Sequence, residues 1–141
     1  MGAFSSQCTF PLHFVEGPMN SDYYCKILQK NLIPHAKKGF RLLQDNDPKH
    51  TSTKTTQWLD NHHVSRIPIP SYSPDLNPIE NLWSVIKRRV EKQAPKNLEQ
   101  MKNLLLNEWK KVDNTTRRNL VNSMKKRCQA VIEAEGRRTK F

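Results

Sequence analysis

Residues 73–83, SPDLNPIENLW, constrain the fold more than any other stretch, because they mark where an amphipathic helix begins. Asn77 is a good N-cap, Pro78 suits the first helical position, and Glu80 stands at the third, as in a capping box. Apolar residues then recur at helical spacing: Ile79, Leu82, Trp83, Ile86 and Val90. The segment therefore predicts a helix from residue 78 that packs one face against a core.

Upstream of this helix, short strand and helix patterns alternate. Residues 3–15 are rich in Phe, Thr and Val and predict a hairpin of two short strands. A helix is expected over residues 21–32, capped by Asn20 or Ser21, and another over residues 51–61. Strands are expected at residues 40–43 and 64–69. The order strand, helix, strand predicts a βαβ unit with a parallel pair.

Downstream, the pattern is helical in two pieces, residues 97–112 and 114–135, with Gly136 as a stop and a frayed basic tail after it. The residues expected to face inward are Met101, Leu104, Leu105 and Trp109 in the first piece, and Leu120, Val121, Met124, Cys128, Val131 and Ile132 in the second. The whole chain is thus predicted to be α/β with a helical C-terminal part.

Composition indicates a foldable, non-membrane chain with an uneven charge. Hydrophobic residues make up 35% and charged residues 26% of the 141 residues, and no apolar run is long enough to span a bilayer. Residues 1–80 carry 8 basic and 7 acidic groups, whereas residues 81–141 carry 16 and 6. This imbalance suggests a polyanion partner, nucleic acid first, and a merely solvated basic surface is the equally open alternative. The three widely spaced cysteines indicate reduced thiols.

Two carboxylates are candidates for chemistry. Asp45 follows the predicted strand at 40–43, where α/β sheets place active-site residues, and Glu80 opens the helix after the next strand. Carboxylates brought together without a basic partner favour a divalent cation, and oxygen ligands suit Mg²⁺ or Mn²⁺. The alternatives are an Asx-turn at Asp45 and a capping-box role for Glu80; Asp47, directly before Pro48, fits a turn better still.

A resemblance adds to this interpretation. The segments QDNDPKHTS (44–52), Trp58 and PSYSPDLNPIENLW (70–83) resemble the Tc/mariner superfamily of DNA transposases, and so does GAFSSQCTFPLHFVEGPMNSDYYCKIL (2–28). The family has an RNase H-like (integrase-like) fold and an Asp-Asp-Glu triad that binds two metal ions. The resemblance implies that Asp45 is the second aspartate and Glu80 the glutamate, with 34 residues between them. It also implies a partial catalytic domain over residues 1–92 and a basic helical extension over residues 93–141.

One departure from the family pattern concerns the first aspartate. In the family it lies on the strand before the GAF segment, whereas here Met1 directly precedes Gly2, and Glu16 and Asp22 come too late to replace it. We therefore expect an incomplete RNase H-like fold that lacks its first central strand. A two-ion site without one carboxylate should bind Mg²⁺ or Mn²⁺ poorly, so the chain is expected to be inactive in isolation.

The full-length activity implied by the resemblance is cut-and-paste DNA transposition, by hydrolysis and then strand transfer. The implied partner is double-stranded DNA, both transposon ends and target, with Lys49, His50, Lys87 and Arg88 as candidate contacts. A nuclear location, a homodimer in a full-length context and no membrane association are the related expectations. The alternatives are a non-catalytic DNA-binding or interaction module derived from a transposase, and a translated relic without function.

Overall fold

The computed structural model describes residues 1–37 and 39–141. Contacts along the chain group these residues into two compact units. Unit 1 comprises Met1–Gly2 and His13–Ser73, and unit 2 comprises Ala3–Leu12 and Pro74–Phe141. The boundary expected at residue 92 between a catalytic core and a helical extension stays a prediction. No helix in the described ranges is long and apolar enough to cross a bilayer.

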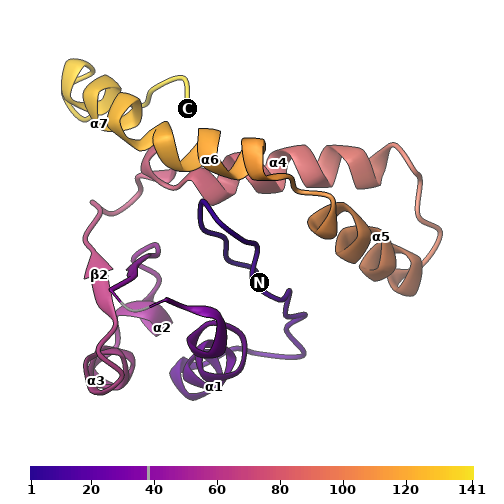
Figure 1. The fold of residues 1–141 in the computed structure, drawn as a ribbon, viewed down its shortest axis with the longest axis horizontal. Coiled ribbons are helices and arrows are strands. Elements are labelled where there is room, and N and C mark those ends of the chain that lie inside the picture. Colours follow the sequence, from indigo (N-terminus) through magenta and orange to yellow (C-terminus); the bar gives the residue numbers. More distant parts are fainter. Residues whose placement is uncertain (38) are drawn as a thin grey trace. The chain divides into compact units, whose positions relative to one another are not determined.

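Unit 1 contains the predicted parallel strand pair. Its elements are α1 (Ser21–Asn31), the 3₁₀ turn η1 (Ile33–His35), β1 (Arg41–Leu43), α2 (Pro48–Thr51), α3 (Thr53–Asn61) and β2 (Ser65–Ile67). Strands β1 and β2 are parallel, with Leu42 opposite Arg66. Parallel strands need a crossover connection, and α2 and α3 supply it. The predicted βαβ unit is therefore confirmed (Figure 1).

The helices of unit 1 begin at side-chain caps and pack against one another. Helix α1 begins where expected, because the Asn20 side chain accepts a hydrogen bond from the Tyr23 N–H. It packs against α3, where Leu59 is fully buried. The helix expected over residues 51–61 is confirmed as α3, which begins at Thr53 because Ser52 caps it by accepting from the Thr55 N–H. The short helix α2 precedes it and ends at Thr51.

Unit 2 is helical, with η2 (Pro74–Leu76), α4 (Pro78–Glu91), α5 (Leu98–Lys110), α6 (Asn114–Asn122) and α7 (Met124–Glu133). After α4 the chain turns back, so that α5 lies against α4 (Figure 1). The core at this contact consists of Leu82, Ile86, Val90, Trp109 and Val112. Trp83 stacks on Trp109 with ring centroids 5.1 Å apart, and the Trp109 indole N–H donates to the Phe10 carbonyl at 2.8 Å. The predicted α4 stripe is thus confirmed.

The hairpin expected over residues 3–15 is present, but its pairing is less regular than that of two continuous strands. Phe4 and Thr9 form an antiparallel bridge, and backbone N–H groups of Phe10 and His13 donate to the carbonyls of Ala3 and Met1, both at 2.9 Å. The Ser5 hydroxyl accepts from the Cys8 N–H and so tightens the turn between Phe4 and Thr9. Pro11 has no N–H to extend the ladder. The segment is therefore an antiparallel hairpin with a tight turn, and its pairing continues at His13 beyond Pro11.

The single helix expected over residues 114–135 is also wrong, because it is interrupted at Ser123 between α6 and α7. The Ser123 hydroxyl donates to the Leu120 carbonyl at 2.6 Å, a local bond that competes with the helical ladder. Several side chains expected to face inward are exposed: Met101, Val121, Cys128 and Ile132. Gly136 does end the helical region, with a φ of 78° that suits glycine.

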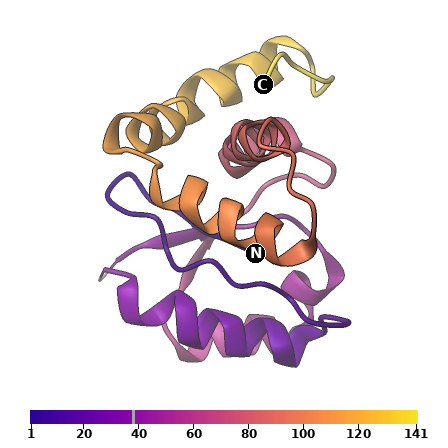
Figure 2. The ribbon, with the colours of Figure 1, turned by 90° about the vertical axis from the view of Figure 1, so that its right-hand side faces the viewer.

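Two arginines of the basic stretch after residue 80 are buried. Arg117 donates to the Gln7 carbonyl at 3.1 Å and also to the Val112 carbonyl. Arg127 donates to the Asp75 carbonyl at 2.8 Å and lies 4.8 Å from the Phe141 ring centroid. The C-terminal tail is therefore anchored, and the expectation of a frayed tail is wrong. Figure 2 shows the C-terminal segment turning back beside α7.

Candidate metal and nucleic-acid site

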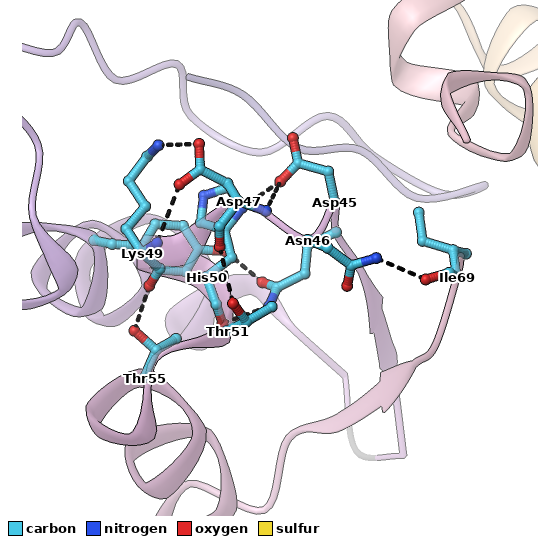
Figure 3. Close-up of polar contacts among 10 residues, drawn as sticks. Asp45, Asn46, Asp47, Lys49, His50, Thr51, Thr55 and Ile69 are labelled. Atoms are coloured by element: carbon cyan, nitrogen blue, oxygen red, sulfur yellow. Dashed lines mark hydrogen bonds and ion pairs between the residues drawn. The ribbon is translucent and has the colours of Figure 1, made fainter. Parts of the chain in front are cut away.

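Asp45 stands in the turn that follows β1, as the sequence predicts. Its Oδ1 accepts from the Asp47 N–H at 3.2 Å and lies 2.6 Å from His50 Nδ1 (Figure 3). Its Oδ2 has no partner within the described residues, and the side chain is 59% exposed. Asp45 therefore forms the Asx-turn that is the alternative to a metal ligand, yet it keeps one oxygen free for a ligand.

His50 lies in the short helix α2 and is held from two sides. Its ring packs against the Tyr24 ring, with centroids 4.2 Å apart. The Gln44 amide donates to the His50 carbonyl at 3.1 Å, and the Tyr24 hydroxyl donates to Gln44 Oε1 at 2.6 Å. His50 Nε2 is buried and without a hydrogen-bond partner in the described chain. Only 13% of the side chain is exposed.

Asp47 has the turn role expected for it. Its side chain accepts from the Lys49 N–H at 3.1 Å and so caps α2, while the Lys49 ammonium forms an ion pair with the other oxygen. The side-chain hydrogen bond from Lys49, above all, holds the pKa of Asp47 below its usual value. Both charges are thus engaged with each other in this conformation.

Asn46 ties the loop after β1 to the loop after β2. Its amide donates to the Ile69 carbonyl at 2.8 Å (Figure 3). Parallel strands end at the same edge of a sheet, and this bond holds the two following loops together there. The residue beside Asp45 is therefore anchored, which limits the freedom of the Asp45 backbone.

Glu80 lies in the first turn of α4, and the capping box predicted as its alternative role is not formed. The Asn77 side chain makes no capping hydrogen bond, and the Asn77 N–H donates to the Pro74 carbonyl at 2.9 Å instead. No hydrogen bond or ion pair reaches the Glu80 carboxylate from residues 1–37 or 39–141. This carboxylate is therefore available to a ligand.

The candidate DNA contacts on α4 are exposed, as expected. Lys87 and Arg88 are both exposed. The neighbouring Arg89 is engaged differently, because it pairs with the buried Glu108 at 3.6 Å. Lys111 also pairs with Glu108, and its side-chain hydrogen bond is the main cause of a lowered Glu108 pKa. Lys87 and Arg88 are thus the cations of this stretch that are not committed to the acidic groups of the described chain.

Each of the two candidate carboxylates suits a hard divalent cation. Asp45 Oδ2 and the Glu80 carboxylate are oxygens without a partner in the described chain, and Mg²⁺ and Mn²⁺ prefer such ligands. No group of three or more His, Cys, Asp or Glu that could hold a metal occurs in the described part of the chain. Asp45 belongs to unit 1 and Glu80 to unit 2, and their pairing stays a prediction.

Sequence reasoning missed the contribution of Tyr24 and Gln44 to this site. Tyr24 occupies an apolar position of α1, and the helical pattern assigns it to the core. It is buried, but its hydroxyl and ring also support Gln44 and His50. The only signal available was the adjacency of Gln44 to Asp45, which says nothing about a partner 20 residues away.

Comparison with known proteins identifies relatives. The family model of the DDE superfamily endonucleases matches residues 1–102. The Tc1 transposase of Caenorhabditis elegans is 40% identical over 99% of this chain and 53% of its own length. The Tc3 transposase of the same organism is 33% identical over 96% of this chain and 43% of its own length. The chain thus spans about half the length of the curated relatives it matches.

Solved structures show the same fold. The Mos1 transposase catalytic domain with raltegravir and Mn matches 99% of this chain and 76% of its own chain, with a TM-score of 0.83 and 18% identity. The Mos1 strand transfer complex matches 87% of this chain and 37% of its own, with a TM-score of 0.76 and 20% identity. The expected RNase H-like α/β class is confirmed by this likeness.

Proposed function

Because the chain belongs to the Tc/mariner superfamily of DDE transposases, we propose that it supplies two of the three carboxylates of a metal-dependent site for DNA cleavage and strand transfer. Asp45 is the second carboxylate of the triad and Glu80 the third. The single observation that carries this assignment is that each has a carboxylate oxygen free of partners in the described chain, whereas Asp47 is occupied by its cap and by Lys49.

The residues present suit Mg²⁺ or Mn²⁺. When bound, such ions activate the attacking water or 3′ hydroxyl and stabilise the leaving oxygen at phosphorus. Asp45 and Glu80 would hold the ions, and the Asn46–Ile69 bond keeps the Asp45 turn in place. The structural relatives include the Mos1 paired end complex with Mn, which supports metal and DNA as the ligands of this chain.

The finer proposal is that the 141 residues alone do not cleave DNA. No acidic residue precedes Glu16, and the resemblance places the first aspartate before Gly2. The fold of these residues by themselves would then lack the first central strand and the carboxylate that strand carries. Two carboxylates bind metal more weakly than three, and transition-state charge is left without its main stabilisation.

Double-stranded DNA, in the form of transposon ends and target, is the proposed partner. Lys87 and Arg88 supply phosphate contacts from α4, and the surplus of basic residues after residue 80 favours the same polyanion. A nuclear location and assembly as a homodimer in a full-length context go with this role. A non-catalytic DNA-binding module is the second candidate, favoured by the exposed cations Lys87 and Arg88.

The metal assignment is tested by titrating Mn²⁺ and following the EPR signal of the free ion. Asp45→Asn and Glu80→Gln should each weaken binding by at least about 10-fold, since each removes a ligand. Asp47→Asn is a matched control, because asparagine still caps α2. Glu99→Gln removes another first-turn glutamate, the exposed one of α5. Equal effects of Asp45→Asn and Asp47→Asn would contradict the assignment.

The activity is tested with a nicking and strand-transfer assay on terminal-repeat DNA in Mn²⁺. The chain alone should bind DNA without cleaving it. A longer protein that includes the upstream strand and its aspartate should cleave DNA, and Asp45→Asn or Glu80→Gln in it should abolish cleavage. Cleavage by the 141 residues alone that Asp45→Ala abolishes would overturn the proposed inactivity.

A further inference from the structure

We propose that His50 is a positioning residue that holds Asp45 Oδ1 through its Nδ1–H, so that Oδ2 is the oxygen presented to a metal ion. Tyr24 and Gln44 in turn hold His50. The inference rests on the proposed function, because it concerns how the metal-binding carboxylate is oriented. It differs from the DNA contact expected of His50, since it directs the imidazole toward the protein's own carboxylate.

The first step is the unequal use of the two Asp45 oxygens. Oδ1 is the acceptor for both the Asp47 N–H and the His50 ring, at 3.2 and 2.6 Å, while Oδ2 has no protein partner in the described structure. The backbone bond alone leaves the exposed carboxylate free to rotate. The shorter contact with His50 fixes the plane of the carboxylate, and Figure 3 shows the second oxygen directed away from the imidazole.

The second step is the tautomer of His50. Nε2 is buried with no hydrogen-bond partner among the described residues. A proton on Nε2 would be an unpaired buried donor, and it would leave Nδ1 facing Asp45 Oδ1 lone pair to lone pair. The neutral form with the proton on Nδ1 avoids both. His50 therefore donates to the carboxylate, as ring N–H groups donate to oriented carboxylates around metal sites.

The third step is what keeps the imidazole in place. The Tyr24 ring covers the His50 ring at 4.2 Å. The Tyr24 hydroxyl donates to Gln44 Oε1, which orients the Gln44 amide so that its N–H donates to the His50 carbonyl. Burial, and next the charge of Asp45, raise the pKa of the Tyr24 hydroxyl far above its usual value, so Tyr24 remains a donor at neutral pH. The chain of contacts runs from α1 to Asp45.

The first experiment compares Mn²⁺ affinities of three His50 variants. Asparagine places an amide N–H close to the Nδ1 position, whereas glutamine places it close to Nε2. His50→Ala and His50→Gln should bind Mn²⁺ about 10- to 100-fold more weakly than the parent, and His50→Asn should remain within about 3-fold of it. His62→Asn, a change at an exposed histidine that contacts Trp58 and not Asp45, should have no effect.

The outcomes separate this inference from the proposed function. A loss with Asp45→Asn but not with His50→Ala would overturn the role of His50 and leave the metal assignment intact. No effect of Asp45→Asn would overturn both. A thermal melt by circular dichroism accompanies each variant and measures how much protein is folded. If His50→Asn and His50→Gln weaken Mn²⁺ binding equally, and only in proportion to the loss of folded protein, His50 has a structural role alone. That result would contradict the inference.

The second experiment needs neither metal nor activity. Long-range ¹H–¹⁵N NMR spectra of the parent chain distinguish the two neutral tautomers of each histidine. We expect His50 to carry its proton on Nδ1, and Asp45→Asn to change the His50 spectrum while leaving that of His62 unchanged. An Nε2-protonated His50 in the parent chain would overturn the inference whatever the metal titrations give.

Discussion

The Asp75 carboxylate accepts two hydrogen bonds from Thr139 on the same oxygen, from the N–H at 2.6 Å and from the hydroxyl at 2.7 Å. Asp75 lies in η2 at the entrance to α4, and Thr139 lies close to the end of the chain. Side-chain and then backbone hydrogen bonds from Thr139 lower the pKa of Asp75. The C-terminal segment is therefore held within unit 2 by a charge-assisted contact, which is stronger than a neutral one.

Thr139→Val should destabilise the chain by about 1–2 kcal/mol at neutral pH, because it removes the hydroxyl donor to a carboxylate and keeps the side-chain shape. The effect should depend on pH. A carboxyl group whose pKa is lowered on folding stabilises the protein above its unfolded pKa, and that contribution is lost as the pH falls through the folded value. Urea unfolding of parent and variant from pH 7 downward measures the difference.

The difference in free energy of unfolding between the parent and Thr139→Val should have its full size above pH 3.8, the ordinary pKa of aspartate, and should shrink at lower pH. Lys140→Ala, at the exposed residue that follows Thr139, is the control and should leave the free energy of unfolding nearly unchanged. A destabilisation by Thr139→Val that is the same at every pH would show that the hydroxyl acts by packing alone.

Arg127→Met should destabilise unit 2 by about 3 kcal/mol, because methionine of similar length leaves buried acceptors without a donor. The guanidinium donates to the Asp75 carbonyl, to Asn81 Oδ1 and to the Ser123 hydroxyl, each at 2.8 Å. Arg118→Met at an exposed site should change the free energy of unfolding by less than about 0.5 kcal/mol. Equal effects of the two changes in urea unfolding would contradict the buried role.

The contrast between Arg127 and Arg118 shows where sequence reasoning stops. Charge counts place both arginines on a basic surface, because composition carries no information about which long side chain finds buried acceptors. Arg127 finds a carbonyl 52 residues away and Arg117 one 110 residues away. Such contacts depend on tertiary geometry, and neither the periodicity of apolar residues nor secondary-structure propensity predicts them.

Local signals were more reliable. The N-cap at Asn20, the parallel pair β1 and β2, and the start of α4 at Pro78 all agree with the structure, since each depends on neighbours in sequence. The apolar stripe after residue 114 failed at Val121, Cys128 and Ile132, which are exposed, and the expected single helix is divided at Ser123. At the candidate site, the motif identified Asp45 but not the Tyr24–Gln44–His50 support, which comes partly from a different helix.

Ile86→Ala should destabilise the chain by about 2–5 kcal/mol, because Ile86 is fully buried at the centre of the contact between α4 and α5. The stability falls because buried apolar surface is lost and because a cavity is left beside Trp109. Ile132→Ala is the matched control, since Ile132 is 71% exposed and should give less than about 0.5 kcal/mol. Thermal or urea unfolding followed by tryptophan fluorescence measures the stability of both variants. A large destabilisation by Ile132→Ala would mean that this face of α7 is buried in solution.

Lys87→Ala with Arg88→Ala should weaken binding to duplex DNA at all sequences alike. Both side chains are exposed on α4, and exposed cations bind phosphates without reading bases. Removing one cation that binds a phosphate should reduce the slope of log affinity against log salt by about 1. Fluorescence anisotropy of labelled DNA between low and moderate salt measures the slope, and the double variant should show a slope lower by about 2.

Lys30→Ala is the control for removal of charge alone, since Lys30 is an exposed cation of the last turn of α1. It should leave the slope unchanged, because the slope follows the number of phosphates that cations contact and Lys30 is not one of the proposed contacts. Arg89 is kept in both proteins, so that Glu108 retains its partner and the fold is undisturbed. If Lys30→Ala lowers the slope as much per charge as the α4 variant, binding follows net charge, and Lys87 and Arg88 do not form a defined DNA contact.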